Sequence, residues 1–195
     1  MPAPELSTEP AVPAAAAPPA VARLGAGELA AAAGELGELL ADAVAGGSSV
    51  GFLAPPDAGE AAAWWRGLAA GVTDGSIVLW AARDAATGRL LGTVQLRLST
   101  MPNGRHRAEL AKLVVHSAAR GRGLGRTLLA HAEHEAVGLG IGLLLLDTET
   151  GSPAERLYEA AGWTRLGTVP RYAADPAGVL RSTTFFHKSL SLPNG

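Results

Sequence analysis

Apolar residues recur along the chain with two periods, and the change of period separates the predicted helices from the predicted strands. Residues 28–44 carry leucine and valine at helical spacing, whereas residues 76–82 and 90–98 are β-rich runs joined by a short connection typical of a hairpin. Residues 141–146 are continuously apolar, which indicates a strand covered on both faces, as in a parallel β-α-β unit. The expected elements, in chain order, are helices over 28–44 and 58–70, strands over 76–82, 90–98 and 109–116, a helix over 124–137, a strand over 141–146, a helix over 153–161 and strands over 164–168 and 181–188.

This order of elements predicts an α/β protein of the α+β kind, in which helices flank one mixed sheet. We expect a single domain over residues 25–190, because a chain of 195 residues has the length of one typical domain. Residues 1–24 are rich in Pro and Ala and are expected to form a disordered tail. Residues 191–195 are expected to form a short C-terminal tail.

Composition and charge narrow the class of function. The chain has 16 Lys and Arg against 18 Asp and Glu, a formal net charge of −2 that argues against nucleic acid as a partner. No apolar run approaches the roughly 20 residues of a membrane span, and the first residues lack the basic start of a signal peptide, so we expect a cytoplasmic protein with no membrane partner. The absence of cysteine excludes disulfides, thiolate metal sites and a cysteine nucleophile. His131 and His134 do not have the spacing of a zinc-binding helix, and no metal is expected.

Residues 120–125 (Arg-Gly-Arg-Gly-Leu-Gly) lie between a predicted strand and a predicted helix. The N–H groups at a helix N-terminus favour an anion because they lack partners within the helix. Glycines let the backbone approach that anion closely, and Arg120, Arg122 and Arg126 add positive charge. The glycine spacing fits neither a P-loop nor a Rossmann fingerprint. The segment therefore predicts a cradle for a diphosphate, and a Gly-rich turn with exposed arginines is the alternative.

The same segment resembles the Q/R-x-x-G-x-G/A signature of the GNAT superfamily of N-acetyltransferases. Residues 154–163 resemble that superfamily's second signature, A-x-x-L-Y-E-x-x-G-F, with Trp163 in place of Phe. The resemblance extends over about residues 76–188. It implies a GNAT-like fold, with a mostly antiparallel central sheet and a parallel β-α-β unit for the cofactor, and it implies acetyl-CoA as the co-substrate.

A closer resemblance, to the tabtoxin-resistance acetyltransferases, is visible over residues 108–113, 117–126 and 146–152. Those enzymes acetylate a β-lactam amino-acid toxin. Gly151 stands where many superfamily members have Asn, so either Ser152 contacts the cofactor instead or the loop is looser. The residues that the resemblance assigns to cofactor binding are Leu113, Val114, Val115, Arg120, Gly121, Arg122, Gly123, Leu124, Gly125, Arg126 and Ser152.

The reaction itself requires a base and an acid. An amine attacks a thioester only as the free base, and a carboxylate can remove its proton. Glu109 and Asp147 lie on successive strands and are the candidate bases, at positions that the closer resemblance also gives to an acidic pair. The phenol of Tyr158 has a pKa near that of an alkyl thiol and is the candidate acid for the CoA thiolate, the role that the resemblance assigns to it. Backbone N–H groups of residues 113–115, at a bulge implied by the resemblance, would meet the oxyanion.

Each catalytic candidate also has a structural interpretation: a capping role for Asp147, an ordinary surface position for Glu109 and core packing for Tyr158. The neighbouring Trp64 and Trp65 cannot share a helix face, so we expect one in the core and the other at the acceptor site.

The expected function is direct transfer of the acetyl group of acetyl-CoA to the amine of a small molecule, with an antibiotic or β-lactam toxin as a candidate acceptor. The absence of cysteine excludes an acetyl-cysteine intermediate. The alternatives are a protein or peptide N-acetyltransferase and a non-catalytic module that binds acetyl-CoA. A monomer and a homodimer are both compatible with the sequence.

Overall fold

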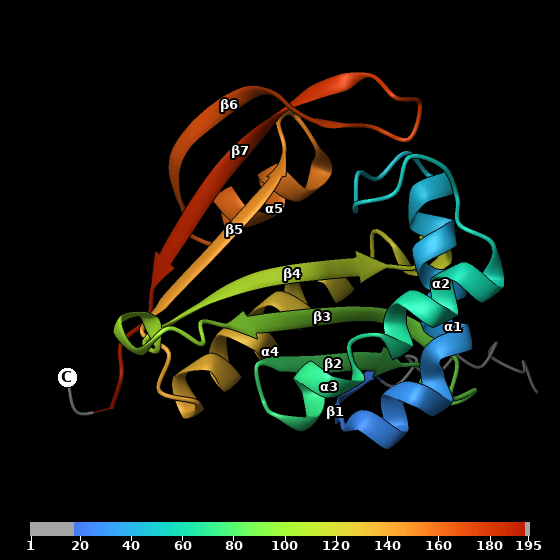
Figure 1. Cartoon of the computed structure of the whole chain (residues 1–195), viewed down its shortest axis with the longest axis horizontal. Helices are drawn as coiled ribbons and strands as arrows, with labels where there is room; N and C mark the ends of the chain where they lie inside the picture. The colour runs from blue at the N-terminus through green and yellow to red at the C-terminus, as the bar shows by residue number, and fades with distance from the viewer. Residues whose placement is uncertain (1–17, 194–195) are drawn as a thin grey trace, which may run out of the picture.

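The computed structural model describes residues 18–193, which form one seven-stranded sheet with helices on both faces (Figure 1). The strand order is β1-β2-β3-β4-β5-β7-β6. The elements are β1 (Ala20–Leu24), α1 (Ala26–Ala45), α2 (Ala58–Arg66), α3 (Ala69–Thr73), β2 (Ile77–Arg83), β3 (Leu90–Leu98), β4 (Arg107–Val115), α4 (Leu124–Gly138), β5 (Leu143–Glu149), α5 (Pro153–Ala160), β6 (Thr164–Ala174) and β7 (Leu180–Ser189), with 3₁₀ turns at Pro102–Gly104 and Ser117–Ala119. Strands β4 and β5 are parallel and the other neighbouring pairs are antiparallel. The predicted α/β architecture with a mixed sheet is confirmed.

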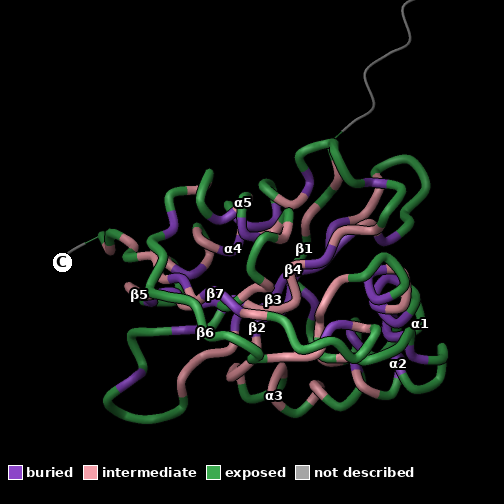
Figure 2. Tube along the Cα trace, turned by 90° about the horizontal axis from the view of Figure 1, so that it is seen from above, coloured by how far each residue is buried: buried purple, intermediate pink, exposed green. Residues whose placement is uncertain are grey.

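Two hydrophobic layers hold the helices against the sheet, because successive side chains of a strand point to opposite faces. Leu79 and Ala81 of β2 pack in one layer with the apolar stripe of α1 and with α2. Val78 and Trp80 of the same strand pack in the other layer with α4. Strand β6 lies at the end of the sheet and is exposed along most of its length (Figure 2).

The N-terminal tail was predicted to be disordered up to residue 24, and this prediction was wrong for its last five residues. Residues 20–24 form β1, which pairs with β2 from Ala20 opposite Arg83 to Leu24 opposite Leu79. Of the five residues of β1, Leu24 alone is buried, so the segment lacks the apolar alternation by which a strand is recognised. The remainder of the predicted N-terminal tail, residues 1–17, lies outside the described residues, as do residues 194–195.

The predicted helix over residues 58–70 is divided in two. Helix α2 ends at Arg66 with Gly67 as its C-cap, and the short α3 begins at Ala69. Asp57 caps α2 as predicted, since its Oδ1 accepts a hydrogen bond from the N–H of Glu60 at 2.7 Å. No helix within residues 18–193 is both long enough and apolar enough to cross a membrane.

The parallel pair β4 and β5 separates soon after it begins. Residues 107–109 pair with residues 143–145, but β4 continues to Val115 and β5 to Glu149. Figure 1 shows the two strands diverging, while β5 stays paired with β7 along its other edge. The facing edges of residues 110–115 and 146–149, which we call the strand split, therefore lack sheet partners for their backbone groups. These groups can bind an extended ligand with amide groups of its own.

Candidate active site

A bulge in β4 lies beside the strand split. The register between β3 and β4 slips there, so that residues 112–113 together oppose the single residue Val94. Lys112 has a φ of 50°, in the left-handed region that residues other than glycine rarely adopt. The bulge implied by the resemblance is thus present at residues 112–113, where the predicted segment 113–115 begins. Such a bulge redirects the side chain that it carries.

The N-terminus of α4 lies directly beyond β4. Gly121 and Gly123 have φ values of 75° and 81°, which are readily available to glycine. No side chain caps α4 at Gly123, whereas Asp57 caps α2 and Ser152 caps α5. The first-turn N–H groups of α4, up to Arg126, are therefore left available to an anion, as the sequence predicts.

The arginines of this loop differ in their surroundings. The Nε of Arg120 donates a hydrogen bond to the carbonyl of Val115 at 3.1 Å, and its guanidinium lies close to Gly46 at the end of α1. Arg120 therefore also braces the loop. Arg122 and Arg126 are exposed and, among the described residues, have no carboxylate within ion-pair distance, so their charge is available to a ligand.

Ser152 serves as the N-cap of α5. Its Oγ accepts a hydrogen bond from the N–H of Glu155 at 3.1 Å and lies 3.3 Å from the Oγ1 of Thr148. Contact with the cofactor remains a prediction for this residue. The preceding Gly151 has a φ of 82°, and Asn is the residue that tolerates such a conformation best after glycine, which explains why the two can alternate at this position.

Glu109 and Asp147 lie on the same face of the sheet, opposite the face that α4 covers. Oε1 of Glu109 is 3.8 Å from Nη1 of Arg97 on β3. Within residues 18–193, the Asp147 carboxylate has no hydrogen-bond or ion-pair partner. Partial shielding from water raises the pKa of Asp147, the negative charge of Glu109 adds to this effect and the positive charge of Lys112 opposes it. The two acids are therefore near one another but differ in their environments.

Tyr158 lies on α5 and is 5% exposed. The centroid of its ring is 5.8 Å from that of Trp163 and 6.2 Å from that of Phe186. Burial raises the pKa of Tyr158 above its ordinary value, and the negative charge of Asp147 raises it further. The phenol therefore stays protonated at neutral pH, so it can donate a hydrogen bond to a thiolate, although it is a weaker acid than the sequence alone predicts.

Lys112 lies at the centre of this region, although it was not among the predicted site residues. Its Nζ donates a hydrogen bond to the carbonyl of Val50, in the loop between α1 and α2, at 3.0 Å. The same atom lies 5.0 Å from the centroid of the Trp64 ring, and Phe52 packs edge-on against that ring at 6.0 Å. A lysine between Ala111 and Leu113 in a predicted strand, in a chain with one other lysine, was the available signal in the sequence.

The adjacent Trp65 has a different role. It is fully buried in the layer beneath α1, and its Nε1 donates a hydrogen bond to the carbonyl of Leu36 at 2.9 Å. The prediction that one member of the tryptophan pair packs in the core is confirmed. Trp64 borders the charged residues of the site.

The loop between α1 and α2 also reaches the end of β6. The Oγ of Ser49 donates a hydrogen bond to the carbonyl of Ala174 at 3.4 Å, and Figure 1 shows the two segments approaching each other. Phe185 of β7 lies opposite Asp147 in the sheet and packs edge-on against Tyr172 at 5.3 Å. The face that carries the two acids is thus bordered by aromatic side chains on two sides.

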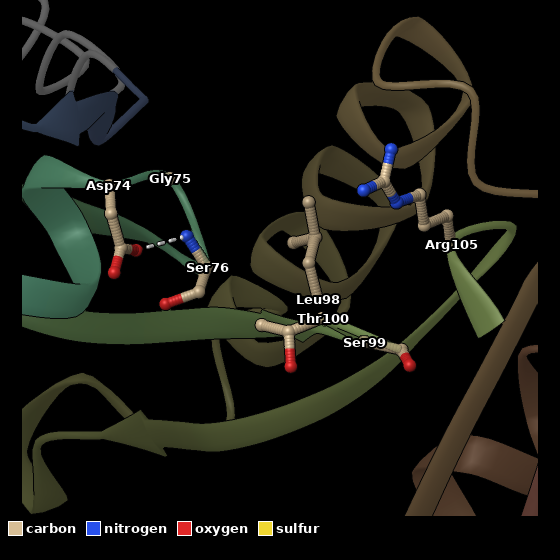
Figure 3. Close-up of a pocket in the computed structure, with 7 residues that line it drawn as sticks. All are labelled: Asp74, Gly75, Ser76, Leu98, Ser99, Thr100 and Arg105. Atoms are coloured by element: carbon tan, nitrogen blue, oxygen red, sulfur yellow. Dashed lines mark hydrogen bonds between the residues drawn. The ribbon is translucent and has the colours of Figure 1, made fainter. Parts of the chain in front are cut away.

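Two other features lie apart from these residues. A pocket of about 340 Å³ is lined by Asp74, Ser76 and Arg105 among others, and contains none of the predicted site residues (Figure 3). On α4, Glu133 accepts hydrogen bonds from the Trp163 indole at 2.7 Å and from Nζ of Lys188 at 2.6 Å, which gives the indole that replaces Phe a partner. Among residues 18–193, no three His, Asp or Glu side chains are grouped as metal ligands.

Residues 49–163 match the model of the Acetyltransferase (GNAT) family, and this stretch is more than half of the chain. The chain therefore belongs to the GNAT acetyltransferase family, and acetyl-CoA is its co-substrate. The predicted GNAT fold and the predicted co-substrate are confirmed. The closer resemblance to the tabtoxin-resistance enzymes remains a prediction.

Solved structures agree on the fold. The chain is similar to yncA, a putative acetyltransferase from Salmonella typhimurium solved with its cofactor acetyl-CoA, with a TM-score of 0.70 and 20% identity over 92% of this chain and 98% of that one. It is also similar to a GNAT superfamily phosphinothricin acetyltransferase from Sinorhizobium meliloti in complex with acetyl-CoA, with a TM-score of 0.69 and 18% identity over 90% of each chain. A putative acetyltransferase from Acinetobacter baylyi gives a TM-score of 0.70 and 19% identity over 91% of this chain and 96% of that one.

Proposed function

We propose that this protein transfers the acetyl group of acetyl-CoA directly to the amine of a small molecule. The observation that carries the proposal is the pair of acids Glu109 and Asp147 on one face of the sheet beside the strand split, next to the uncapped N-terminus of α4. Tyr158 is buried in the layer on the other face, and the charge of Asp147 still raises its pKa across the split. A module that only bound acetyl-CoA would need none of these three side chains.

The binding of acetyl-CoA follows from the donors that the chain presents. The first-turn N–H groups of α4 and the exposed Arg122 and Arg126 suit its diphosphate. The unpaired edge of β4 at residues 113–115 suits the amides of its pantetheine arm. Bound acetyl-CoA supplies an acyl carbon that is open to attack and a thiolate leaving group.

Asp147 is the better candidate for the base. Its raised pKa brings the carboxylate closer to the pKa of the ammonium that it must deprotonate, while Glu109 is engaged by Arg97. As the amine nitrogen bonds to the acetyl carbon, Asp147 takes the amine proton, directly or through water. The carbon–sulfur bond then breaks, and the hydroxyl of Tyr158 donates to the sulfur.

A small acceptor is favoured over a peptide by the contact between the α1–α2 loop and the end of β6. The hydrogen bond from Ser49 to Ala174 joins the two segments above the acidic face, where a long peptide would need an open groove. Amine antibiotics and β-lactam toxins are candidate acceptors on the basis of the closer resemblance. Two similar folds, at 22% and 18% identity, are described as phosphinothricin acetyltransferases, so phosphinothricin joins the candidates.

The test is release of the CoA thiol from acetyl-CoA in the presence of a panel of amine toxins, free amino acids, polyamines and peptides. We expect rapid release with a small amine and a corresponding gain of one acetyl group on that amine by mass spectrometry. Asp147→Asn should abolish the release and leave acetyl-CoA binding intact, which calorimetry can show. Binding of acetyl-CoA without transfer to any amine would overturn the proposal in favour of a binding module.

A further inference from the structure

Four charged side chains from three neighbouring strands interact on the face of the sheet opposite α4: Arg97 on β3, Glu109 and Lys112 on β4, and Asp147 on β5. Of these, Lys112 contacts the α1–α2 loop. The four charges sum to zero, but only two of them form an ion pair with each other. Arg97 and Glu109 lie opposite each other in the sheet and form an ion pair at 3.8 Å. Lys112 and Asp147 remain, and among the described residues neither has an opposite charge within 4 Å.

Lys112 has binding capacity that the protein does not use. An ammonium group has three N–H donors, and the carbonyl of Val50 accepts one of them. The Trp64 ring lies 5.0 Å from the same nitrogen and holds the side chain in place at the bulge. At least one donor is therefore left for a ligand.

The surroundings disfavour the charge on both residues as long as no ligand is bound. Burial lowers the pKa of Lys112 and the positive charge of Arg97 adds to this effect, while the negative charges of Glu109 and Asp147 oppose it without reversing the direction. Asp147 is exposed at the surface, but partial desolvation raises its pKa; the negative charge of Glu109 adds to that effect and the positive charge of Lys112 opposes it. An anion next to Lys112 and an ammonium next to Asp147 would each favour the ionised form. The site thus complements a molecule with charges of both signs.

We propose that the acetyl acceptor is an amine that also carries an anionic group, such as a free amino acid, whose anion Lys112 binds while its amine faces Asp147. Lys112 is then a residue that determines acceptor specificity, and the ring of Trp64 borders the apolar part of the acceptor. The inference rests on the proposed function and adds the substrate class. Polyamines and neutral amines, which offer nothing to Lys112, are excluded as good substrates.

The test uses the standard L-amino acids and their carboxamides, which differ in the charge of the carboxyl group. At equal concentrations of free amine, wild-type protein should acetylate the preferred acid with a kcat/KM on the order of tenfold to a hundredfold above that of its amide. Lys112→Gln, which keeps a long side chain at the same φ, should lose this preference mainly through KM. Lys112→Arg should retain part of it, and Arg23→Gln, an exposed cation on β1, should behave as wild type.

Equal rates for acids and amides in the wild type, or an unchanged preference in Lys112→Gln, would overturn the inference. Binding to the CoA-loaded protein, followed by tryptophan fluorescence, separates it from the proposed function. Acids that bind more tightly than amides without being acetylated would support the role of Lys112 and refute the proposed function. Acetylation of polyamines in preference to acids would support the proposed function and refute the role of Lys112. Binding of neither acids nor amides would also refute the role of Lys112.

Discussion

Gly123 and Gly125 are two glycines of the segment 120–125 for which the structure predicts opposite responses to alanine. Gly123 has a φ of 81°, whereas Gly125 lies within the first turn of α4. A Cβ at Gly123 would meet nothing within 4 Å. A Cβ at Gly125 would lie 3.5 Å from the Leu157 side chain, an ordinary contact distance. Crowding is therefore not the reason for either glycine, and backbone conformation decides the outcome.

The magnitude follows from the conformations. Alanine in the left-handed region costs about 1–2 kcal/mol, and the reduced entropy of the unfolded chain offsets about 0.4–1 kcal/mol of this cost. Gly123→Ala should therefore lower the free energy of unfolding by roughly 0.5–1 kcal/mol. Alanine exceeds glycine in helix propensity by up to about 1 kcal/mol, so Gly125→Ala should be neutral or stabilising. The two variants should differ by about 1–2 kcal/mol.

Urea unfolding of the two variants without ligand measures this difference directly. Calorimetry with acetyl-CoA then shows whether Gly123→Ala relieves its strain by turning the peptide, because the N–H groups at the start of α4 would lose their direction and bind more weakly. Equal stability of the two variants would show that the left-handed conformation at Gly123 is not required and would refute the reasoning.

The remaining predictions concern the site. Glu109→Gln should lower the pKa of Asp147 and Lys112→Gln should raise it, because negative Glu109 disfavours and positive Lys112 favours the ionised carboxylate. Carbon-13 NMR titration of Asp147 measures the pKa in each variant. The acidic limb of the pH profile of kcat/KM should move in the same direction as this pKa. Two unmoved pKa values would show that the groups do not interact. Tyr158→Phe should lower kcat by about 10²-fold while leaving acetyl-CoA affinity unchanged, and an equal turnover would remove the tyrosine from catalysis. Gln95→Leu should raise the free energy of unfolding by about 1–3 kcal/mol, because both polar atoms of this buried amide lack a hydrogen-bond partner within the described residues. Urea unfolding measures this, and a variant less stable than the wild type would contradict the prediction.

Local signals were sufficient for much of the fold. The β-rich run at residues 90–98 coincides with β3, and the glycine-rich turn marks the start of α4 at the predicted residue. Both features depend on side chains close together in the chain. By contrast, β1 is held by backbone pairing with β2, and its residues Ala20–Leu24 bury too little apolar surface to show a pattern.

The part of the candidate site that lies in sequence motifs could be predicted from the sequence. Spacing and resemblance indicated Glu109, Asp147 and Tyr158, but they did not distinguish the two acids. That distinction depends on Arg97, which faces Glu109 through the register of β3 and β4. Lys112, to which we propose an acceptor-binding role, was not predicted for the same reason, because its direction follows from a bulge between strands rather than from its neighbours in the chain.

A crystal structure of this protein with acetyl-CoA bound tests the central claim most directly. We expect the diphosphate against the first-turn N–H groups of α4, the pantetheine arm in the strand split, and the thioester sulfur within hydrogen-bond distance of the Tyr158 hydroxyl. Acetyl-CoA bound away from the split, or a sulfur that Tyr158 cannot reach, would contradict the account.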